Sequence, residues 1–443
     1  MKTKQKNGIS LIVLVITIIV MIVLATAIIL SLISNGIIEK ANKAKKNTDY
    51  ANAKELINTL MTDWNLMSEA DKQKVSGDGT FVTYAKNKMM SLGYKMTESD
   101  NKITGTYEVT EDGKVYRYPV IPEGFTASSI EGEKLVSEGL VIYENVQGQD
   151  NKVTAEDTDG DGIIDAQVER NQFVWIPVED INEFVRREGY KEGKLQTYLS
   201  EGIVTEPYNP DMSTITDENE ILTVQKEQKE YKDMVASVEK YGGFYLARYE
   251  MGDDEATEAR TEATEARRIV SKRDKFVYNY VPWGASTVNV GTFEKNGKNI
   301  AGAVALSRGM YENNEHFVSI LPYGVQWDAM LRFVEDENHS IIDSSSWGAH
   351  SNYRNQETGD EKVNIMNGVQ KSGITEHWKA KNLYEVAGNT WEWTMECKGK
   401  TRVKRGGYWA MHGNIKPVST RYPFLGTTYI HQSYGFRVAL YLL

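Results

Sequence analysis

The chain is nearly without cysteine, since Cys397 is the single thiol among its 443 residues. One thiol excludes an intrachain disulfide framework, a metal site built of cysteines alone and a redox-active cysteine pair. An excess of positive charge is missing too, because 51 basic residues stand against 62 acidic ones and the formal net charge is −11. A general binder of nucleic-acid backbones needs a basic face, so the composition argues against that class.

Familiar catalytic motifs are also missing. The sequence contains no convincing Ser-His-Asp set, phosphate-binding loop or dinucleotide fingerprint. What it does contain is enough apolar material for a core, because 40 % of the residues are hydrophobic and 26 % are charged. That balance excludes wholesale disorder. A chain of this length is expected to form two or three domains, at about 100–200 residues each.

One long hydrophobic run stands near the N-terminus. Residues 9–33 carry no charge, and at about 1.5 Å per residue they give roughly 37 Å of helix, more than the roughly 30 Å core of a bilayer. A cleavable secretory signal would have a shorter apolar region. Lysines before the run favour a cytoplasmic N-terminus. The sequence therefore predicts a transmembrane helix over 9–35, and a single-pass protein of the cell membrane whose C-terminal body is extracellular, at the cell surface.

A short basic leader, residues 1–8, ends in Gly8 and is followed at once by the apolar run. This arrangement resembles the prepilin signal of type IV pilins and pseudopilins. The resemblance implies that a prepilin peptidase cuts after Gly8 and that the new N-terminus, Ile9, is methylated. The fifth mature residue of that family is usually glutamate, whereas here it is Val13. The departure argues against assembly into a pilus.

Residues 36–120 are predicted to form a pilin-like unit, one long helix packed on a small antiparallel sheet. Apolar residues recur at helical spacing along one face of the helix, at Ala53, Ile57, Leu60, Met61 and Trp64. Strands are predicted at 80–84, 103–109 and 114–118. An Asp-Gly turn joins the last two strands as a hairpin.

A second, larger unit is predicted over residues 121–443, where short apolar stretches alternate with scattered glycines. A charged insertion at 252–270 interrupts it. Within the insertion, residues 254–268 repeat Thr-Glu-Ala almost without change. Alanine, glutamate and arginine are good helix formers and the charges alternate in sign, so the insertion is predicted to be a solvated helix or loop.

An acidic loop lies near the start of the larger unit. Aspartates stand at positions 1, 3, 5 and 9 of a calcium-type loop, with glycine at 6: Asp157, Asp159, Asp161 and Asp165. This alternation turns carboxylate oxygens, the ligands that calcium prefers, toward one point. Position 12 is Val168 instead of glutamate, so the loop is not a complete EF-hand. The sequence predicts a structural calcium here, and the alternative is a polar hairpin turn.

The C-terminal region carries the most specific pattern. Three blocks, residues 382–394, 402–409 and 434–440, follow one another in a fixed order. They resemble the core of the formylglycine-generating, or sulfatase-modifying factor, family. Residues 173–178 and 241–250 resemble its opening strands.

The resemblance implies an α+β fold of the C-type-lectin-like kind, with a ligand surface near the C-terminus. It also implies that the Gly-Asn-x-Trp-Glu-Trp turn helps to hold a structural calcium, through Asn389 and Glu392. Ordinary core packing is the favoured interpretation of Trp391 and Trp393.

The same family includes enzymes that bind copper through two cysteines upstream of the Gly-Phe-Arg block. The matching stretch here, residues 414–421, has no cysteine, and Cys397 alone cannot form a dithiolate copper site. Copper is therefore not expected. His412 and His431 are possible metal ligands, but isolated histidines without carboxylate support are more often surface residues.

Between Gly407 and Gly435 the chain is crowded with Tyr, Trp, Phe, His, Asn and Ser. Such residues give large contact area and adaptable hydrogen bonds, as in antibody paratopes. The segment resembles the variable segment of proteins diversified by retroelements, which lies on a C-type-lectin-like fold and ends at a Gly-Phe-Arg block. The predicted ligand-binding residues are Tyr408, Trp409, Met411, His412, Asn414, Tyr422, Phe424, Tyr429, His431 and Tyr434. The alternative is an aromatic loop that packs on its own domain.

Together these observations predict a pilin-anchored binding protein, or adhesin, that is not an enzyme. Its expected partners are an extracellular protein or glycan ligand, the membrane, the prepilin peptidase and other pilins, and no nucleic acid. Two alternatives stay open. One is a copper-dependent oxidase of the formylglycine-generating type, or another modifying enzyme, and the other is a structural minor pilin or pseudopilin.

Overall fold

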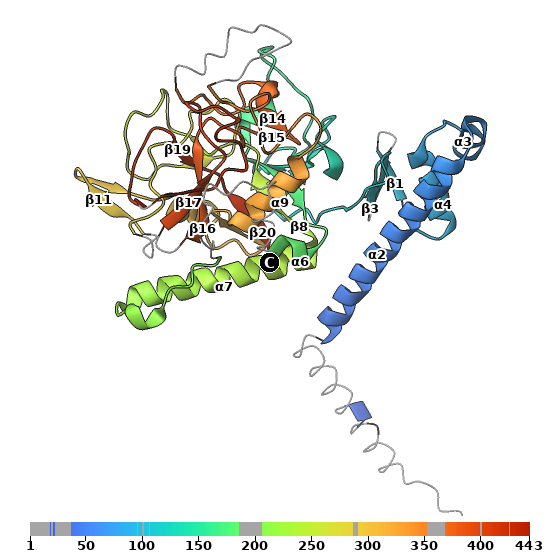
Figure 1. Cartoon of the computed structure of the whole chain (residues 1–443), viewed down its shortest axis with the longest axis horizontal. Coiled ribbons are helices and arrows are strands. Elements are labelled where there is room, and N and C mark those ends of the chain that lie inside the picture. The colour runs from blue at the N-terminus through green and yellow to red at the C-terminus, as the bar shows by residue number, and fades with distance from the viewer. Residues whose placement is uncertain are drawn as a thin grey trace, which may run out of the picture. The chain divides into compact units, whose positions relative to one another are not determined.

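The computed structural model describes residues 18, 21–22, 37–94, 96–99, 102–105, 107–185, 206–286, 291–351, 368–398, 401–424 and 426–443. They fall into two compact units. The smaller unit comprises Met1–Tyr94 and Glu111–Val115, and the larger unit comprises Lys95–Thr110 and Tyr116–Leu443. Figure 1 labels many of their helices and strands.

The smaller unit is built on α2 (Ile37–Leu66), the long helix that the apolar spacing predicts. Its buried face carries Tyr50, Ala53, Ile57, Leu60 and Trp64. These residues are three or four apart and so share one side of the helix. Helix α3 (Glu69–Ser76) follows, and the side chain of Ser68 caps it by accepting a hydrogen bond from the Asp71 amide at 3.2 Å.

The strand predicted at 80–84 is wrong, because this stretch begins α4 (Phe81–Ser91). Thr80 caps the helix by accepting a hydrogen bond from the Thr83 amide. Phe81, Ala85 and Met89 are buried at helical spacing, and the ring of Tyr84 stacks on Trp64 at 5.6 Å between centroids. Five residues rich in β-formers resemble a strand when they are taken alone, whereas the longer helical period decides the outcome.

The predicted membrane anchor is also corrected. In the described part of the chain, which includes residues 18, 21 and 22 of the predicted span, no helix has both the length and the apolar character needed to cross a membrane. This finding contradicts the transmembrane helix over 9–35 and the single-pass cell-surface location. The leader 1–8, with the predicted processing residues Gly8 and Ile9, lies outside the described residues.

The predicted Asp-Gly hairpin belongs to a small four-stranded sheet of order β1-β2-β3-β4. Its strands are β1 (Met96–Ser99), β2 (Lys102–Gly105), β3 (Tyr107–Val109) and β4 (Val115–Arg117). The predicted strand 103–109 is divided into β2 and β3, which pair with each other through Ile103 and Val109. Gly113 takes a positive φ of 77° in the turn before β4, a conformation that glycine adopts without strain.

The larger unit has an α+β architecture around a six-stranded sheet of order β13-β20-β8-β7-β6-β5. The strands are β5 (Phe125–Ala127), β6 (Val141–Glu144), β7 (Gln172–Pro177), β8 (Gly243–Ala247), β13 (Phe317–Ile320) and β20 (Ala439–Leu442). Apart from Gln172 at the start of β7, strands β7 and β8 show no polar alternation and are buried nearly throughout, as expected of strands covered on both faces. Their cross-strand rings Trp175 and Tyr245 meet edge to face at 4.8 Å.

Helices cover this sheet. Helix α7 (Glu218–Tyr241) packs against β8 and β20, which are labelled near it in Figure 1. Helix α8 (Ala303–Gly309) packs against β13, and α9 (Gly324–Val334) packs against β7. The shorter elements are η1 (Val136–Glu138), α5 (Asp165–Glu169), α6 (Ile181–Val185), η3 (Met212–Thr214), β9 (Gly252–Asp253), β10 (Ile269–Val270), β11 (Phe293–Lys295), β12 (Lys298–Ile300), η5 (Glu376–Trp378), β14 (Lys379–Ala380) and β15 (Leu383–Tyr384).

A second sheet, of order β18-β17-β16-β19, holds the C-terminal motifs. Its strands are β16 (Trp391–Lys398), β17 (Thr401–Arg405), β18 (Tyr422–Phe424) and β19 (Tyr434–Phe436). Strands β16 and β19 run parallel, whereas β17 is antiparallel to both β16 and β18. The C-terminal blocks noted in the sequence therefore meet in one sheet.

The charged insertion forms a loop between β9 and β10, which pair with each other. Within the loop, Arg260 makes a 2.6 Å ion pair with the buried Asp253. Its guanidinium also lies 3.9 Å from the ring centroid of Tyr278. Of the two structures predicted for the insertion, the loop is the one found.

Candidate functional site

The backbone that enters the aromatic segment is fixed by a glycine pair after β17. Gly406 and Gly407 have φ values of 92° and 81°. A Cβ atom on Gly407 would lie 2.3 Å from the carbonyl oxygen of Lys416, so a larger residue does not fit. The backbone at Gly407 therefore passes close to the backbone of Lys416 where the aromatic segment begins.

The strand registers bring distant residues onto one face of the C-terminal sheet. Lys404 of β17 pairs with Tyr422 of β18 and with Trp393 of β16. Trp391 of β16 pairs with Tyr434 of β19. Because residues opposite each other on paired strands share a face, and so do residues two apart on one strand, these side chains gather on one surface.

We call this surface the aromatic patch. Its residues are Trp391, Tyr408, Tyr422, Tyr429, His431 and Tyr434, arranged around Lys404. The ring of Trp391 lies 5.8 Å from that of Tyr408 and 5.3 Å from that of Tyr422, between centroids. Tyr434 lies 5.8 Å from Tyr429 and 5.4 Å from His431. The structure thus brings together five of the ten predicted ligand-binding residues.

Lys404 lies at the centre of the patch and was not identified from the sequence. Its Nζ atom is 3.4 Å from the ring centroid of Tyr434, 5.2 Å from that of Tyr422 and 5.3 Å from that of Trp393. Ring faces favour the charged amine, whereas burial opposes it. Burial prevails and lowers the pKa of Lys404 to about 6.

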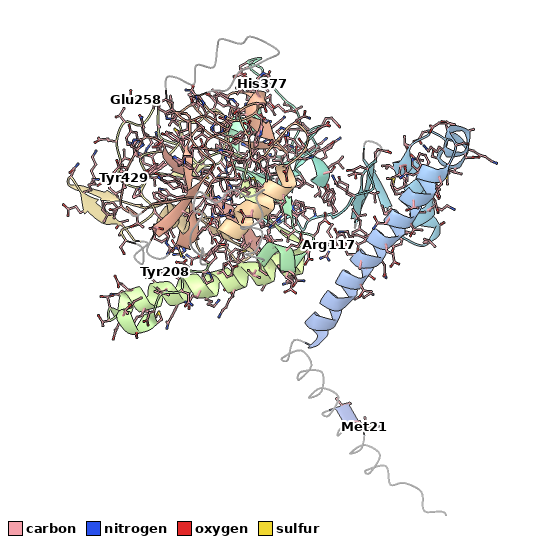
Figure 2. The ribbon with its side chains drawn as sticks, in the orientation of Figure 1. Met21, Arg117, Tyr208, Glu258, His377 and Tyr429 are labelled. Atoms are coloured by element: carbon pink, nitrogen blue, oxygen red, sulfur yellow. The ribbon has the colours of Figure 1, made fainter. Side chains whose placement is uncertain are left out.

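The patch is open to solvent on one side. Tyr429 is 47 % exposed and lies at the surface of the larger unit (Figure 2). Tyr408, Tyr422 and His431 are half-buried, whereas Tyr434 is buried. His431 Nδ1 lies 2.7 Å from the hydroxyl of Ser433, which fixes the imidazole ring. Burial and, second, the neighbouring Lys404 lower the pKa of His431.

Four of the other predicted ligand residues lie on the turn after β17, and the fifth, Phe424, lies on β18. His412 and Asn414 are exposed, and Met411 is half-buried. Trp409 packs against a small buried cluster that contains Trp378. The backbone of Phe424 belongs to β18, and its side chain lies outside the described part.

A buried serine and histidine support this turn. Ser344 Oγ lies 2.9 Å from His350 Nε2, and it also accepts a hydrogen bond from the Val418 amide. Burial lowers the pKa of His350 to about 4. Both side chains are fully buried, so the pair holds the loop instead of facing a substrate. Neither residue stood out in the sequence, because the pair depends on contacts with the segment after residue 407.

Buried ion pairs hold the segment just before its start and near its middle. Arg405 donates to Glu396 at 2.8 Å and to Asp328 at 2.9 Å. Arg421, within the segment, donates to the same two carboxylates. All four side chains are almost fully buried. Two guanidinium groups and two carboxylates balance in charge, and they tie the segment to β16 and α9.

The predicted calcium ligands Asn389 and Glu392 have other partners. Glu392 accepts hydrogen bonds from Arg437, the shortest at 2.9 Å. Asn389 donates its side-chain amide to Glu250 and accepts from the Gln370 amide with its oxygen. Their oxygens are thus directed at protein donors in this arrangement.

Three buried glutamates surround that arginine. Burial raises the pKa of Glu385 to about 8, with Arg437 opposing the shift. Burial raises the pKa of Glu250 well above its ordinary value, and the neighbouring Glu392 adds to the effect. Burial also raises the pKa of Glu392, against Arg437. One guanidinium does not neutralise three carboxylates, so part of this cluster holds protons at neutral pH.

The acidic loop keeps three of its four aspartates together. One carboxylate oxygen from each of Asp157, Asp159 and Asp165 lies within 4.8 Å of the others. Asp161 is not part of this group, and it accepts a hydrogen bond from the Ile163 amide at 2.7 Å. Asp157 accepts from the amides of Gly160 and Gly162. These donors are carboxylate oxygens, which are the type of ligand that calcium prefers. Calcium binding stays a prediction.

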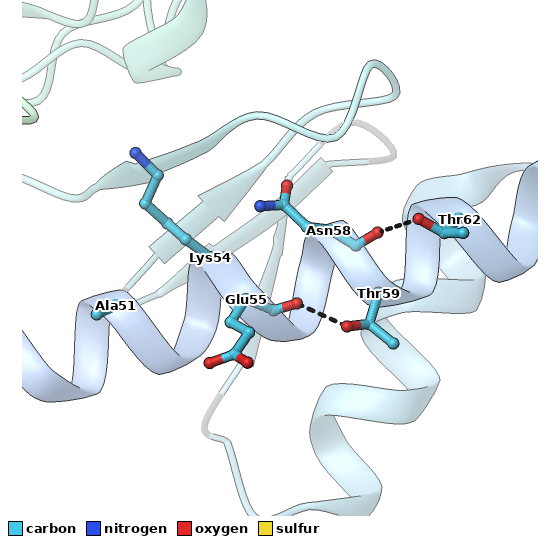
Figure 3. A pocket seen from close by; sticks show the side chains of 6 residues that line it. All are labelled: Ala51, Lys54, Glu55, Asn58, Thr59 and Thr62. Carbon is cyan, nitrogen blue, oxygen red and sulfur yellow. Dashed lines mark hydrogen bonds between the residues drawn. The ribbon is translucent and has the colours of Figure 1, made fainter.

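A hollow of about 500 Å³ lies along α2 in the smaller unit. Figure 3 shows its lining, and the described residues that form it all lie on one face of that helix. The hydroxyls of Thr59 and Thr62 donate to the carbonyl oxygens of Glu55 and Asn58 at 3.0 and 2.9 Å. Since those polar groups serve the helix itself, we assign no ligand there.

No family model and no curated protein matches the chain. Among solved structures, Treponema denticola variable protein 1 aligns with 44 % of this chain and 95 % of its own, at 12 % identity and a TM-score of 0.27. A likeness at that TM-score carries no argument about fold or function. The resemblances to pilins and to the formylglycine-generating family stay predictions.

Proposed function

We propose that the chain is a non-catalytic binding protein whose ligand, a protein or a glycan, contacts the aromatic patch. The observation that carries this proposal is the clustering of four half-buried or exposed rings around the C-terminal sheet. Tyr422 lies on β18, and loop residues Tyr408, Tyr429 and His431 pack beside Trp391 and Tyr434 of the same sheet. Aromatic side chains with polar tips give large contact area at a small cost in conformational entropy. Such residues are enriched at the centres of binding interfaces.

The surroundings of the patch support the proposal. The segment that bears the patch is tied at Arg405 and Arg421 to two buried carboxylates. A fixed backbone reduces the ordering cost of binding. The same anchoring lets exposed side chains change without loss of the fold, which suits a segment diversified by a retroelement.

Binding to glycan and protein arrays tests the proposal. The variant Tyr422→Ala with Tyr429→Ala should lose binding by at least about 10-fold, since truncation of even one aromatic hot spot costs about 2 kcal/mol or more. Ile342→Ala is the matched control, because Ile342 is 47 % exposed, like Tyr429, and lies outside the patch. The thermal midpoint should stay nearly unchanged in both proteins. Unaltered binding by the double variant, or its unfolding, would refute the proposal.

Diversification is tested by comparing the gene among sister isolates. Differences should fall on exposed or half-buried positions such as His412, Asn414 and Tyr429. They should spare Val418 and Arg421, which lie in the same segment but are buried. A reverse transcriptase gene and a near-copy of the 3′ end should lie nearby. An invariant segment without these elements would leave a binding protein of fixed specificity.

A further inference from the structure

A second hollow, of about 350 Å³, lies in the larger unit and shares no residue with the aromatic patch. It is bounded by the end of β6, the last residues of the charged insertion, and α8 with the residues that follow it. This volume is near the lower end of the range of about 300–1,000 Å³ that is usual for small-molecule sites. A ligand of this pocket is therefore a single small molecule.

Polar groups form the deep end of the pocket. Asn171 donates its side-chain amide to Glu144 Oε2 at 2.7 Å, and its own oxygen accepts from the Ser271 amide at 2.8 Å. Asn171 therefore holds the Glu144 carboxylate in place. Beside them lies the buried hydroxyl of Tyr311, close to the side chains of Glu144 and Asn171 but outside ordinary hydrogen-bond geometry with them. Burial and, next, the neighbouring Glu144 raise the pKa of this phenol, which keeps its proton.

Cationic groups stand at the mouth. The side chains of Arg267 and Arg268 line the pocket and are 37 % and 66 % exposed. Their ion pairs with Asp253 and Asp254 are long, at 3.5 and 3.7 Å. Between the mouth and the deep end, the wall includes the apolar side chains of Ala305, Leu306 and Met310. The pocket thus presents an acid inside, an apolar wall and two guanidinium groups outside.

We propose that this pocket binds a free α-amino acid with an apolar side chain. Its ammonium group donates to Glu144 and to the Tyr311 hydroxyl oxygen, and its carboxylate meets Arg267 and Arg268. Its side chain lies along α8. A plain cation would be repelled at the mouth and a plain carboxylate at the deep end, so the arrangement selects a zwitterion. This site is independent of the function proposed for the aromatic patch.

Titration calorimetry with L-leucine and L-phenylalanine on the full chain tests the proposal. At least one of them should bind, whereas N-acetyl-leucine, which lacks the ammonium, and leucine amide, which lacks the carboxylate, should each bind at least about 10-fold more weakly. That factor corresponds to one lost hydrogen bond to a charged group. No saturable binding of either amino acid, or equal binding of leucine and its two derivatives, would overturn the proposal.

Two variants locate the site. Glu144→Gln removes the charge, keeps an acceptor for Asn171 and should weaken leucine binding by about 10-fold or more. Tyr311→Phe keeps the ring that packs on Phe125 and Phe317 and should weaken binding several-fold. Glu337→Gln, an exposed change outside the pocket, should leave affinity unchanged. Wild-type affinity in both pocket variants would contradict this assignment even where leucine binds.

Discussion

Replacing Glu385 by glutamine tests whether the buried glutamates set the pH dependence of stability in the larger unit. Glu385 is fully buried, and one of its oxygens accepts a hydrogen bond from the Gly373 amide at 2.9 Å. Burial raises its pKa from 4.5 to about 8. The folded state therefore holds this proton more tightly than the unfolded state does. The stability that the proton confers is complete below pH 4.5 and is lost as the pH rises through about 8.

The size of the effect follows from the two pKa values. Each pH unit between 4.5 and about 8 removes about 1.4 kcal/mol from the free energy of unfolding, so the whole interval removes about 5 kcal/mol at most. Glutamine keeps an acceptor for the Gly373 amide but cannot ionise. The variant should therefore lose this part of the pH dependence. The Glu385 carboxylate also helps to raise the pKa of Glu250. The variant should therefore also lose part of the pH dependence of stability that Glu250 contributes.

Urea unfolding followed by tryptophan fluorescence, from about pH 5 to about pH 8, measures the difference. The wild type should lose several kcal/mol more than Glu385→Gln over this interval. Glu337→Gln, an exposed substitution of the same kind, should follow the wild type. Parallel curves for wild type and Glu385→Gln would refute the reasoning, because the carboxyl group would then titrate as it does in the unfolded chain.

Two further predictions concern other charged groups. Lys404 has a pKa lowered to about 6 in the folded state, so stability should fall as the pH drops from about 10 toward 6, where only the unfolded state takes up the proton. Lys404→Met should remove that slope and raise the free energy of unfolding at neutral pH, by up to about 5 kcal/mol, as measured by denaturant titration; an unchanged slope would contradict the assignment. In the acidic loop, calcium at about 100-fold excess over its Kd should stabilise the chain by about 2.7 kcal/mol relative to a chelator control. Asp157→Asn with Asp165→Asn should abolish this gain in thermal unfolding and Asp161→Asn should keep most of it, whereas equal loss in both would show that the three-carboxylate group is not the site.

Local patterns account for what the sequence predicted well. Helix α2 follows from the spacing of Ala53, Ile57, Leu60 and Trp64, and the hairpin turn follows from Asp112 and Gly113, because each depends on residues a few positions apart. The acidic loop has the same local character. The aromatic composition of the C-terminal segment likewise selected a stretch whose tyrosines do gather on one surface.

Long-range pairing accounts for what the sequence could not show. The position of Lys404 among the rings depends on the register of three strands, and nothing near residue 404 specifies that register. Arg437 and Glu392, 45 residues apart, find each other only in the folded sheet. The pocket beside Tyr311 is assembled from four separate parts of the chain. Such sites cannot be recognised in the sequence until the strand pairing and the fold are known.

The position of β20 has a consequence for translation. This strand follows the aromatic segment in the chain, yet it lies inside the six-stranded sheet, between β13 and β8. The ribosome must therefore pass the whole segment before the sheet can close. A stop codon or frameshift anywhere from residue 408 to residue 434 leaves β13 and β8 without the strand between them. A chain truncated within the segment therefore lacks the strand that joins the two parts of this sheet, and only a chain read in frame through the segment can complete it.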